Sequence, residues 1–482
     1  MKYLFLVLFI CGFASKGVSN NISVTSVALT GQNTTAGLNN ANNFTLVQFN
    51  LSWENSHRVS FGPTNWDAAW VFVKYKVAGT TNWNHARLNN SGHTAPVGST
   101  IDIGLGTPGT VFNTTTNPGV GAFIYRSTVG TGTFAANSVQ LRWNYGANGI
   151  ADNAVIEVQV YAVEMIFVPS GAFNAGGGGG NSAFTSTTIN TGVATTIPAG
   201  VGSLGGQAGG YPTGQTAPIA SFPNGFGAFY TMKYEISQQQ YVDFLNNLNT
   251  TSASTRFPNN LTSRNGISLG TGVNAGIYVT TNPAVACNFL SWADFTAYLD
   301  WSGLRPMTEL EFEKACRGTV LPIVGENAWG TTSFTAATGF VNGGLPNEAV
   351  LNAGANVCIS GITGPLRVGI FAGTNTTRAQ AGATFYGAME YSGNVFERTI
   401  TIGLVEGRLF NGLHGDGTIA SDGSANVLNW PANATGTGAG IKGSAWIDGT
   451  TANLGISDRQ FVSSSSAGRS RHVGGRGVRT AP

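Results

Sequence analysis

Charged residues are scarce in this chain of 482 residues. Asp, Glu, Lys and Arg together make up 10% of it, against about 25% in a typical soluble protein. The net charge of +2 gives little long-range field, which excludes electrostatic steering of nucleic acid or of an anionic membrane surface. The polar surface must therefore consist of Asn, Thr, Ser, Gln and Gly. Such a surface suits an extracellular protein that packs against neighbours or binds neutral ligands.

Cysteine is scarce as well, since the chain has only Cys11, Cys287, Cys316 and Cys358. This excludes a disulfide framework of the kind that holds small secreted domains together. Cys11 falls in a segment that we predict to be removed. Cys287 and Cys316 either form one bridge or are small buried apolar side chains, and the sequence leaves both alternatives open.

Long apolar runs are missing after the first residues. No later segment contains 18 apolar residues in a row, so we predict no membrane insertion. At the start, Lys2 precedes an apolar run over residues 3–13 and the small residues Gly17, Val18 and Ser19. This order is typical of a secretory signal. We therefore predict a signal peptide over residues 1–19 and a mature protein that is secreted or held at the cell surface.

Residues 20–162 have the alternating pattern of β-strands. Val47, Phe49, Leu51 and Trp53 alternate with polar residues, and the same period recurs near residues 70–75, 139–143 and 156–160. Turns rich in glycine and asparagine separate these segments. Several short strands without a helical period predict an all-β, sandwich-like domain.

Glycine, serine and threonine dominate residues 174–217, with glycine at every position from 176 to 180. Such a composition buries too little apolar surface to fold on its own. No Lys-Ser/Thr follows the glycines, which excludes a phosphate-binding loop. We expect a surface loop at residues 174–217.

Three short helices are predicted after residue 222 by their capping boxes, in which a side chain satisfies an amide that the helix start leaves unpaired. The boxes are Ser237 with Gln240, Ser291 with Asp294, and Thr308 with Glu311. Gly303 and Gly318 are placed to end the second and third helices. The remainder, to residue 482, is glycine-rich and has little periodicity.

Six short motifs follow one another in this part of the chain. They are V-E-M-I-F-V-P-S-G-A-F at 163–173, E-I-S-Q-Q-Q-Y-V-D-F at 235–244, P-A-V-A-C-N-F-L-S-W at 283–292 with L-R-P-M-T-E-L-E-F-E at 304–313, S-G-N-V-F-E at 392–397, K-G-S-A-W at 442–446 and G-V-R at 477–479. In this order they resemble the formylglycine-generating-enzyme (sulfatase-modifying-factor) family, whose fold is a variant of the C-type-lectin-like fold. We therefore predict an α+β protein, with a β-sandwich-like domain at 20–162 and an irregular formylglycine-generating-enzyme-type domain at 163–482.

The enzymatic members of that family oxidise a substrate cysteine with a pair of copper-binding cysteines, spaced C-x4-C after G-G-S-W. Thiolates are the soft ligands that select Cu(I). By the resemblance, Thr451 and Ile456 stand in the two places, with Arg459 as the family's following arginine. No cysteine follows Cys358. The resemblance therefore implies a scaffold without this chemistry, so we expect a protein that is not an enzyme and binds no copper.

The family also binds structural calcium near its S-G-N-V-W-E motif. By the resemblance, Glu390 and Glu397 supply carboxylates, and Gly393 and Val395 supply backbone carbonyls, to Ca²⁺, which prefers such hard oxygen ligands. Glu390 departs from the family, which more often has Asp or Asn there. The alternative is that Glu397 pairs with Arg398 or caps backbone amides.

Other polar residues give weaker signals. His85 and His93 lie close in the sequence, but without a third ligand they do not make a metal site. Of the C-terminal arginines, Arg479 belongs to the closing motif and is expected to pack, while Arg476 and its upstream neighbours are expected to be solvated.

Three functions remain open. The first is a non-catalytic structural, assembly or adhesion protein that associates with itself or with cell-surface components. The second is a lectin-like module that binds glycans through its loops or through a platform of tryptophans, namely Trp53, Trp66, Trp70 and Trp83; burial of these side chains in a core is the competing explanation. The third is a copper-dependent cysteine oxidase with a displaced site at Cys287 and Cys316.

Overall fold

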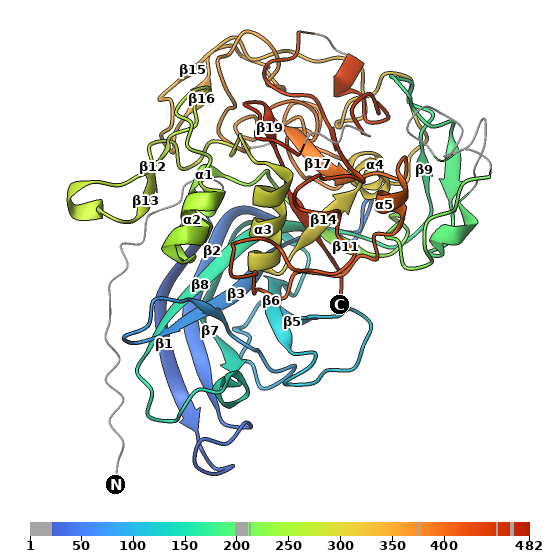
Figure 1. Cartoon of the computed structure of the whole chain (residues 1–482). Helices are drawn as coiled ribbons and strands as arrows, with labels where there is room; N and C mark the ends of the chain where they lie inside the picture. Colours follow the sequence, from blue (N-terminus) through green and yellow to red (C-terminus); the bar gives the residue numbers. More distant parts are fainter. Residues whose placement is uncertain (1–21, 198–210, 212–213, 374–375, 450–451, 463–466) are drawn as a thin grey trace.

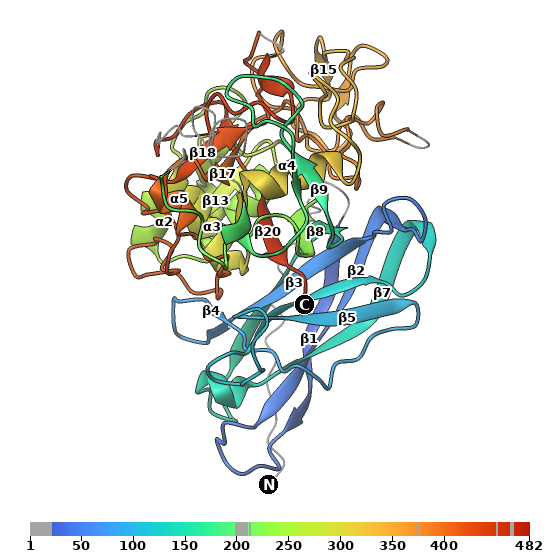
Figure 2. The ribbon, with the colours of Figure 1, turned by 90° about the vertical axis from the view of Figure 1, so that its right-hand side faces the viewer.

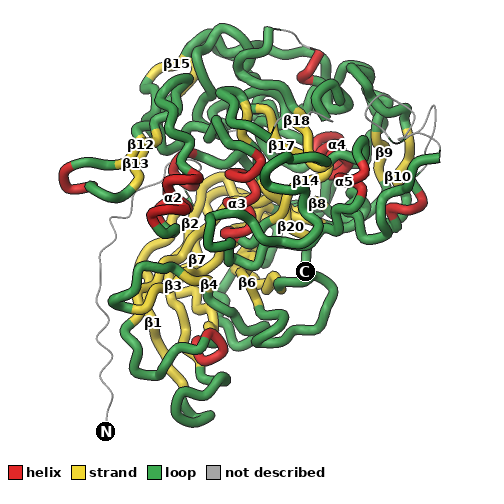
Figure 3. Tube along the Cα trace, in the orientation of Figure 1, coloured by secondary structure: helices red, strands yellow, loops and turns green. Residues whose placement is uncertain are grey.

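The computed structural model describes residues 22–482 apart from 198–210, 212–213, 374–375, 450–451 and 463–466. The predicted signal peptide therefore lies outside the described residues. Loops make up most of the C-terminal half, and long strands make up most of the N-terminal half (Figure 3). The coarse fold prediction is confirmed, because the described chain is rich in strands and its helices are few and short.

Eight strands and one short helix form the N-terminal half. They are β1 (Ser23–Asn33), β2 (Phe44–Arg58), β3 (Asp67–Val77), β4 (Asn84–His85), β5 (Ser99–Leu105), β6 (Gly119–Arg126), β7 (Gly130–Trp143), η1 (Tyr145–Asn148) and β8 (Ile156–Val168). In Figures 1 and 2 these strands form the lower part of the molecule.

Two sheets face each other in this half. One has the order β1-β2-β7, and the other contains β8-β3-β6-β5. The side chains predicted to alternate on β2, Val47 to Trp53, are buried in one cluster with Val71 and Val73 of β3 and with Leu141 of β7. The alternation therefore marks the inner face of a sandwich, as predicted, because successive side chains of a strand point to opposite faces.

The second sheet continues into the C-terminal half. Its order is β18-β17-β14-β20-β11-β8-β3-β6-β5, so β8 pairs with β3 on one side and with β11 on the other. The boundary that we placed between residues 162 and 163 falls inside β8. The division into two domains stays a prediction, but one sheet crosses it.

The C-terminal half adds short elements around this sheet. They are β9 (Phe173–Ala175), β10 (Thr187–Ile189), η2 (Ala194–Thr196), β11 (Phe229–Met232), α1 (Gln238–Asn246), α2 (Thr250–Arg256), β12 (Ile267–Leu269), η3 (Gly272–Asn274), β13 (Tyr278–Thr280), α3 (Trp292–Ser302), β14 (Arg305–Thr308), α4 (Glu309–Arg317), β15 (Phe340–Val341), β16 (Ala349–Val350), β17 (Phe396–Ile400), α5 (Val405–Arg408), β18 (Ala439–Lys442), η4 (Ala452–Leu454), β19 (Val473–Gly474) and β20 (Gly477–Thr480).

The three predicted capping boxes are confirmed at the starts of α1, α3 and α4. In each, the Ser or Thr oxygen accepts from the backbone amide three residues on, and the Gln, Asp or Glu at that position accepts from the cap amide. Gly303 ends α3 in a left-handed conformation with φ 73°, which glycine adopts without the cost of a Cβ.

The glycine-rich segment is more ordered than predicted. Its described residues contain the β9–β10 hairpin, and Phe184 and Ile189 are buried in the main core. The prediction of a plain surface loop is wrong for this part, because a few large apolar residues between the glycines supply the buried surface. Residues 198–210 and 212–213 of the segment lie outside the described chain.

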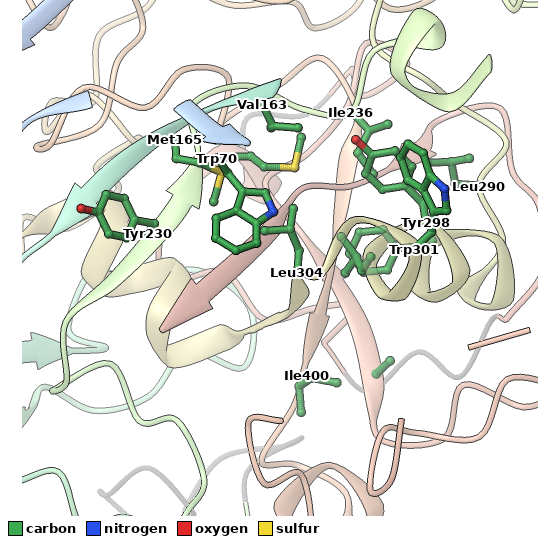
Figure 4. Close-up of a cluster of buried hydrophobic side chains, with 14 of the residues drawn as sticks. Trp70, Val163, Met165, Tyr230, Ile236, Leu290, Tyr298, Trp301, Leu304 and Ile400 are labelled. Atoms are coloured by element: carbon green, nitrogen blue, oxygen red, sulfur yellow. The ribbon is translucent and has the colours of Figure 1, made fainter. Parts of the chain in front are cut away.

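Aromatic packing joins the two halves. Phe72 of β3 meets Trp301 of α3 edge-on at 5.0 Å between ring centroids, and the Trp70 indole N–H donates to the carbonyl of Ser302 at 2.8 Å. Figure 4 shows Trp70 in one cluster with Tyr230 and Trp301. Aromatic side chains bury large areas, so this contact fixes the halves against each other.

All three cysteines in the described residues are free and buried. Cys287 belongs to the main core and Cys316 to a separate cluster. Of the two alternatives that the sequence left open, the structure therefore shows small buried apolar side chains and no bridge. Within the described residues, no helix has the length and apolar character needed to cross a membrane.

Candidate functional site

The described part of the segment that matches the family's cysteine pair, from Leu454 to Arg459, is mostly buried. Thr451 lies outside the described residues, but Ile456 is buried among the apolar side chains around Phe312, and its amide donates to the carbonyl of Glu326 at 3.0 Å. This position offers no group able to bind a metal ion or attack a substrate.

Arg459, which matches the family's arginine, forms a buried ion pair with Glu309. Its guanidinium donates to both oxygens of Glu309, at 2.6 and 3.0 Å, and its carbon lies 3.6 Å from the ring centroid of Phe184 in the glycine-rich segment. A paired, hydrogen-bonded charge is the form in which arginine is tolerated in a core. Arg459 therefore holds its own segment against both α4 and the glycine-rich segment.

The motif residues are likewise structural. Arg305 and Glu311 belong to the motif at 304–313. They form a bidentate ion pair, with N–O distances of 2.8 and 2.6 Å. Asn394 of S-G-N-V-F-E donates to Glu235 of the second motif at 2.5 Å and accepts from the amide of Leu366 at 2.8 Å. Buried hydrogen bonds thus join motifs that lie far apart in the sequence, which holds these short segments together in an irregular fold.

The residues predicted to bind calcium are gathered around a guanidinium. Arg476 donates to both oxygens of Glu397, at 2.7 and 2.6 Å, which gives Glu397 an ion-pair partner that we had not considered. Arg476 is itself fully buried, and the prediction that it is solvated is wrong. No cue in the local sequence shows that a partner lies 79 positions away.

Of the other predicted calcium ligands, Glu390 has one protein partner, and the contacts of Gly393 and Val395 are made by their amides rather than by the carbonyls that were predicted to bind the ion. Glu390 accepts from the Gly369 amide at 2.9 Å through one oxygen, while its second oxygen is buried without a partner among the described residues. The amides of Gly393 and Val395 donate to Gly443 and Glu235. Glu390 has φ 55°, a conformation that Asp and Asn adopt more readily than Glu.

The carboxyl groups of Glu235, Glu390 and Glu397 lie near one another and near the positive charge of Arg476. Burial raises the pKa of Glu390 to about 7 and that of Glu235 well above its usual range, and the nearby Glu397 adds to both shifts. Arg476 opposes the shifts. The described part of the chain contains no group of three or more His, Cys, Asp or Glu side chains arranged to hold a metal ion. Arg476 supplies a positive charge at Glu397 in place of a cation, and calcium at Glu390, Gly393, Val395 and Glu397 stays a prediction.

The tryptophans do not form a surface platform. Trp53 of β2 is buried in the core between the two sheets. Trp70 of β3 is buried in the main core, which includes side chains of the C-terminal half. Trp66 is partly buried between Phe167 and Tyr125, at 4.0 and 5.3 Å between ring centroids. The core explanation therefore holds for these three.

A polar cavity of about 400 Å³ lies where the two halves meet. Tyr75, His85 and Arg87 line it from the sandwich, and His414 and Asp416 line it from the loop after α5. Ligand sites in proteins usually have volumes of about 300–1,000 Å³. This is the feature that sequence reasoning missed, although the run G-L-H-G-D-G at 412–417 places one His and one Asp between glycines.

Both cavity histidines are kept neutral. Burial lowers the pKa of His85 well below its usual range, and Lys74 and Arg479 lower it further, against a hydrogen bond to Val120. Burial followed by Arg479 and Arg305 does the same for His414. Neutral imidazoles offer one donor and one acceptor each. His93, by contrast, does not line the cavity, and its two ring nitrogens lie against the carbonyl of Asn89 and the amide of Arg142.

Comparison with known proteins identifies the family of the chain through a family model. The family model of the sulfatase-modifying factor enzyme 1-like domain matches residues 155–481, which is more than half of the chain and includes all six motifs. No curated protein matches the chain. One solved structure that matches is a Major Tropism Determinant U1 Variant, at 16% identity and a TM-score of 0.25 over 69% of this chain. The chain spans 66% of that protein's length, slightly less than two thirds. With the family model covering the motifs and their buried contacts, this chain belongs to the sulfatase-modifying factor enzyme 1-like domain family.

Proposed function

We propose that the protein is a secreted, non-catalytic scaffold that serves assembly or adhesion outside the cell. The observation that carries this proposal is the closed core at the family's catalytic position. Ile456 packs there among apolar side chains, and the arginine that follows is held by both oxygens of Glu309. Among the described residues, Ile456 and Arg459 therefore serve packing and ion pairing in the fold at that place.

The displaced oxidase is the less favoured alternative. Burial raises the pKa of Cys287, Cys316 and Cys358 above the usual thiol value, whereas reactive cysteines have a lowered pKa and some exposure. A peptide-oxidation assay with added copper tests it directly. Activity that disappears in Cys287→Ser or Cys316→Ser would restore the oxidase and remove the scaffold proposal.

The surface favours contact with neighbours. β1 is an edge strand whose 11 residues include no charged side chain and no proline. Natural edge strands usually carry such residues because these block pairing with another chain. The pairing of β1 with β2 shifts register at two places. These irregularities divide β1 into shorter regular stretches that could pair with a strand of another chain. We therefore infer that β1 contributes to association between copies or with a cell-surface partner.

Imaging and gel filtration of the mature protein test the assembly. We expect ordered particles larger than a monomer, and we expect the exposed substitution Thr25→Lys on β1 to reduce them. The matched control is Gln48→Lys, which places the same charge on the central strand β2. A protein that stays monomeric at high concentration and coats no cell would refute the scaffold proposal.

Binding of neutral ligands such as glycans is a second candidate, favoured by the polar cavity at the junction. A glycan array probed with the full mature chain tests it. Hits support an adhesion role through sugars, and a blank array counts against it without affecting the assembly result.

A further inference from the structure

The N-terminal sandwich contains an apolar cavity of its own, separate from the polar cavity between the halves. It has a volume of about 190 Å³ and lies where β1, β2 and the end of β7 meet η1 and the start of β8. The interiors of proteins are close-packed, and voids larger than a water molecule are few. A cavity of this size at one end of a sandwich core is therefore a candidate binding site.

The wall of the apolar cavity suits a small hydrocarbon group. Leu29, Ile150 and Ile156 contribute aliphatic side chains, and Trp143 contributes an aromatic one. No charged side chain is among the described residues that line the cavity, and the Thr45 hydroxyl in the lining already donates to a backbone carbonyl at 2.9 Å. An engineered protein cavity of about 150 Å³ with apolar walls stays dry and binds benzene. Since the cavity in this protein is slightly larger, a benzene-sized group fits into it.

The apolar cavity opens to solvent through half-buried residues. Trp143 is only 1% exposed, whereas Ile150 and Ile156 are half-buried, so the lining runs from the core to the surface. Ala151 and Ala154, which are also half-buried, line the cavity from the loop before β8. Their methyl groups take little space, and larger side chains at these positions would fill the opening.

Hydrogen bonds hold the rim of the apolar cavity in place. The Tyr145 hydroxyl accepts from the side-chain amide of Gln32 at 3.1 Å and donates to the Asp152 carboxylate at 2.8 Å. Asp152 also accepts from the Asn39 amide at 2.8 Å and from the Asn43 side chain at 2.9 Å. These bonds join β1 and the turn after it to the loop after η1, so the cavity is formed in advance, as most small-molecule sites are. The carboxylate beside the rim disfavours an anionic ligand.

We propose that the apolar cavity binds a small uncharged molecule through a benzene-sized apolar group. Binding removes this group from water and supplies packing contacts to the side chains around Trp143, which a cavity denies them. An ion is disfavoured, because the lining has no opposite charge to offset the loss of its hydration. This binding depends neither on assembly nor on glycan recognition at the junction.

Nuclear magnetic resonance of the full mature chain, with ¹³C labels in the methyl groups of Ile and Leu, tests the proposal. The probe is benzyl alcohol. We expect saturable shifts of the Leu29, Ile150 and Ile156 methyl signals, with a Kd on the order of 1 mM. Ile400, which is buried in the C-terminal half, is the internal control and should not shift. Benzoate has the same ring with a negative charge, and we expect it to bind about tenfold more weakly.

Substitutions at the opening separate the apolar cavity from the rest of the surface. Ala154→Phe fills the opening and should abolish the shifts. Val155→Phe places the same ring on the next residue, which is 42% exposed and outside the lining, and should leave the Kd unchanged. Ala151→Leu adds a smaller group at the opening and should weaken binding. It replaces Ala154→Phe in the test if that variant loses the wild-type Ile400 signal and is therefore misfolded.

Three results would overturn the proposal. The first is the absence of saturable shifts at the cavity methyl groups, or shifts of the same size at Ile400, which would mean non-specific solvation by the probe. The second is equal binding of benzyl alcohol and benzoate. The third is wild-type affinity in the folded variants that fill the opening.

Discussion

The two halves of the molecule are held together by different forces. In residues 22–162 an apolar core fills the space between two sheets, and Lys76–Glu157 is the only ion pair that lies wholly within this described stretch. In the C-terminal half, buried ion pairs link short elements and loops. Arg305–Glu311, Arg317–Glu326 and Arg459–Glu309 all have side chains at most 2% exposed.

The comparison explains where a chain with few charges places them. Six arginines are among its largest fully buried side chains: Arg305, Arg317, Arg408, Arg459, Arg476 and Arg479. Loops lack the hydrogen-bond ladders of sheets, so their carbonyls and amides need other partners. A guanidinium has five donors, so one arginine can bind several loop carbonyls as well as a carboxylate. Several of the chain's few charges are therefore buried, where they link loops and short elements.

Breaking a buried pair should show the largest effect. We expect Arg476→Met to lower the free energy of unfolding by about 3–5 kcal/mol, because it leaves the Glu397 carboxylate buried and unpaired. Urea unfolding followed by circular dichroism measures the change. Lys76→Met, in the sandwich pair whose side chains are 21% and 26% exposed, is the matched control and should cost about 0–1 kcal/mol. Equal losses in the two variants would refute the contrast between the halves.

A cavity in the sandwich core should have the next largest effect. Leu141 is fully buried on β7, and Leu141→Ala should cost about 2–5 kcal/mol. Leu38→Ala, at a side chain 82% exposed, should change stability by less than about 0.5 kcal/mol. Tryptophan fluorescence during urea unfolding measures both.

The same variant tests the division at residue 162. Because one sheet runs through β3, β8 and β11, we expect Leu141→Ala to move a single unfolding transition. A first transition that moves alone, with the second unchanged, would show that residues 20–162 unfold as a separate domain.

The sequence predicts best what depends on neighbours along the chain. Capping boxes and strand alternation are local, so Ser291 with Asp294 and the run at residues 47–53 were predictable. The partner of Glu397 was not, because Arg476 has no sequence pattern that marks it as buried. The polar cavity was also missed, since His85 and His414 come from different halves and lie 329 positions apart in the sequence, so only the packing of the two halves brings them together.

Acidic side chains buried in both halves should make stability depend on pH. Burial, with Asp67 nearby, raises the pKa of Glu164 to about 8 despite Lys233. A carboxyl whose folded pKa lies above its unfolded value of 4.5 stabilises the fold at low pH, and this contribution is lost as the pH rises through the folded pKa. Because the unfolded carboxyl loses its proton near pH 4.5 and the folded one near pH 8, we expect thermal stability to fall between about pH 5 and about pH 8, by a few °C.

Glu164→Gln should flatten that dependence, because the amide does not titrate. Glu157→Gln, on the same strand with its side chain 26% exposed, is the matched control and should keep the wild-type slope. Differential scanning calorimetry across this pH range measures both. If the Tm of Glu164→Gln changes with pH as steeply as that of the wild type, groups other than Glu164 cause the pH dependence of stability.

Calcium should give the smallest effect in the wild-type protein. The resemblance predicts Ca²⁺ at Glu390 and Glu397, but Arg476 occupies both oxygens of Glu397. A ligand that binds the folded state raises stability by RT ln(1 + [L]/Kd), so we expect no change in Tm between EDTA and millimolar Ca²⁺. In Arg476→Met the carboxylates lose their counter-charge, and Ca²⁺ should restore part of the lost stability while Mg²⁺, which demands tighter octahedral geometry, should restore less. Stabilisation of the wild type by Ca²⁺ would instead confirm the metal site and show that the guanidinium does not take the place of the cation.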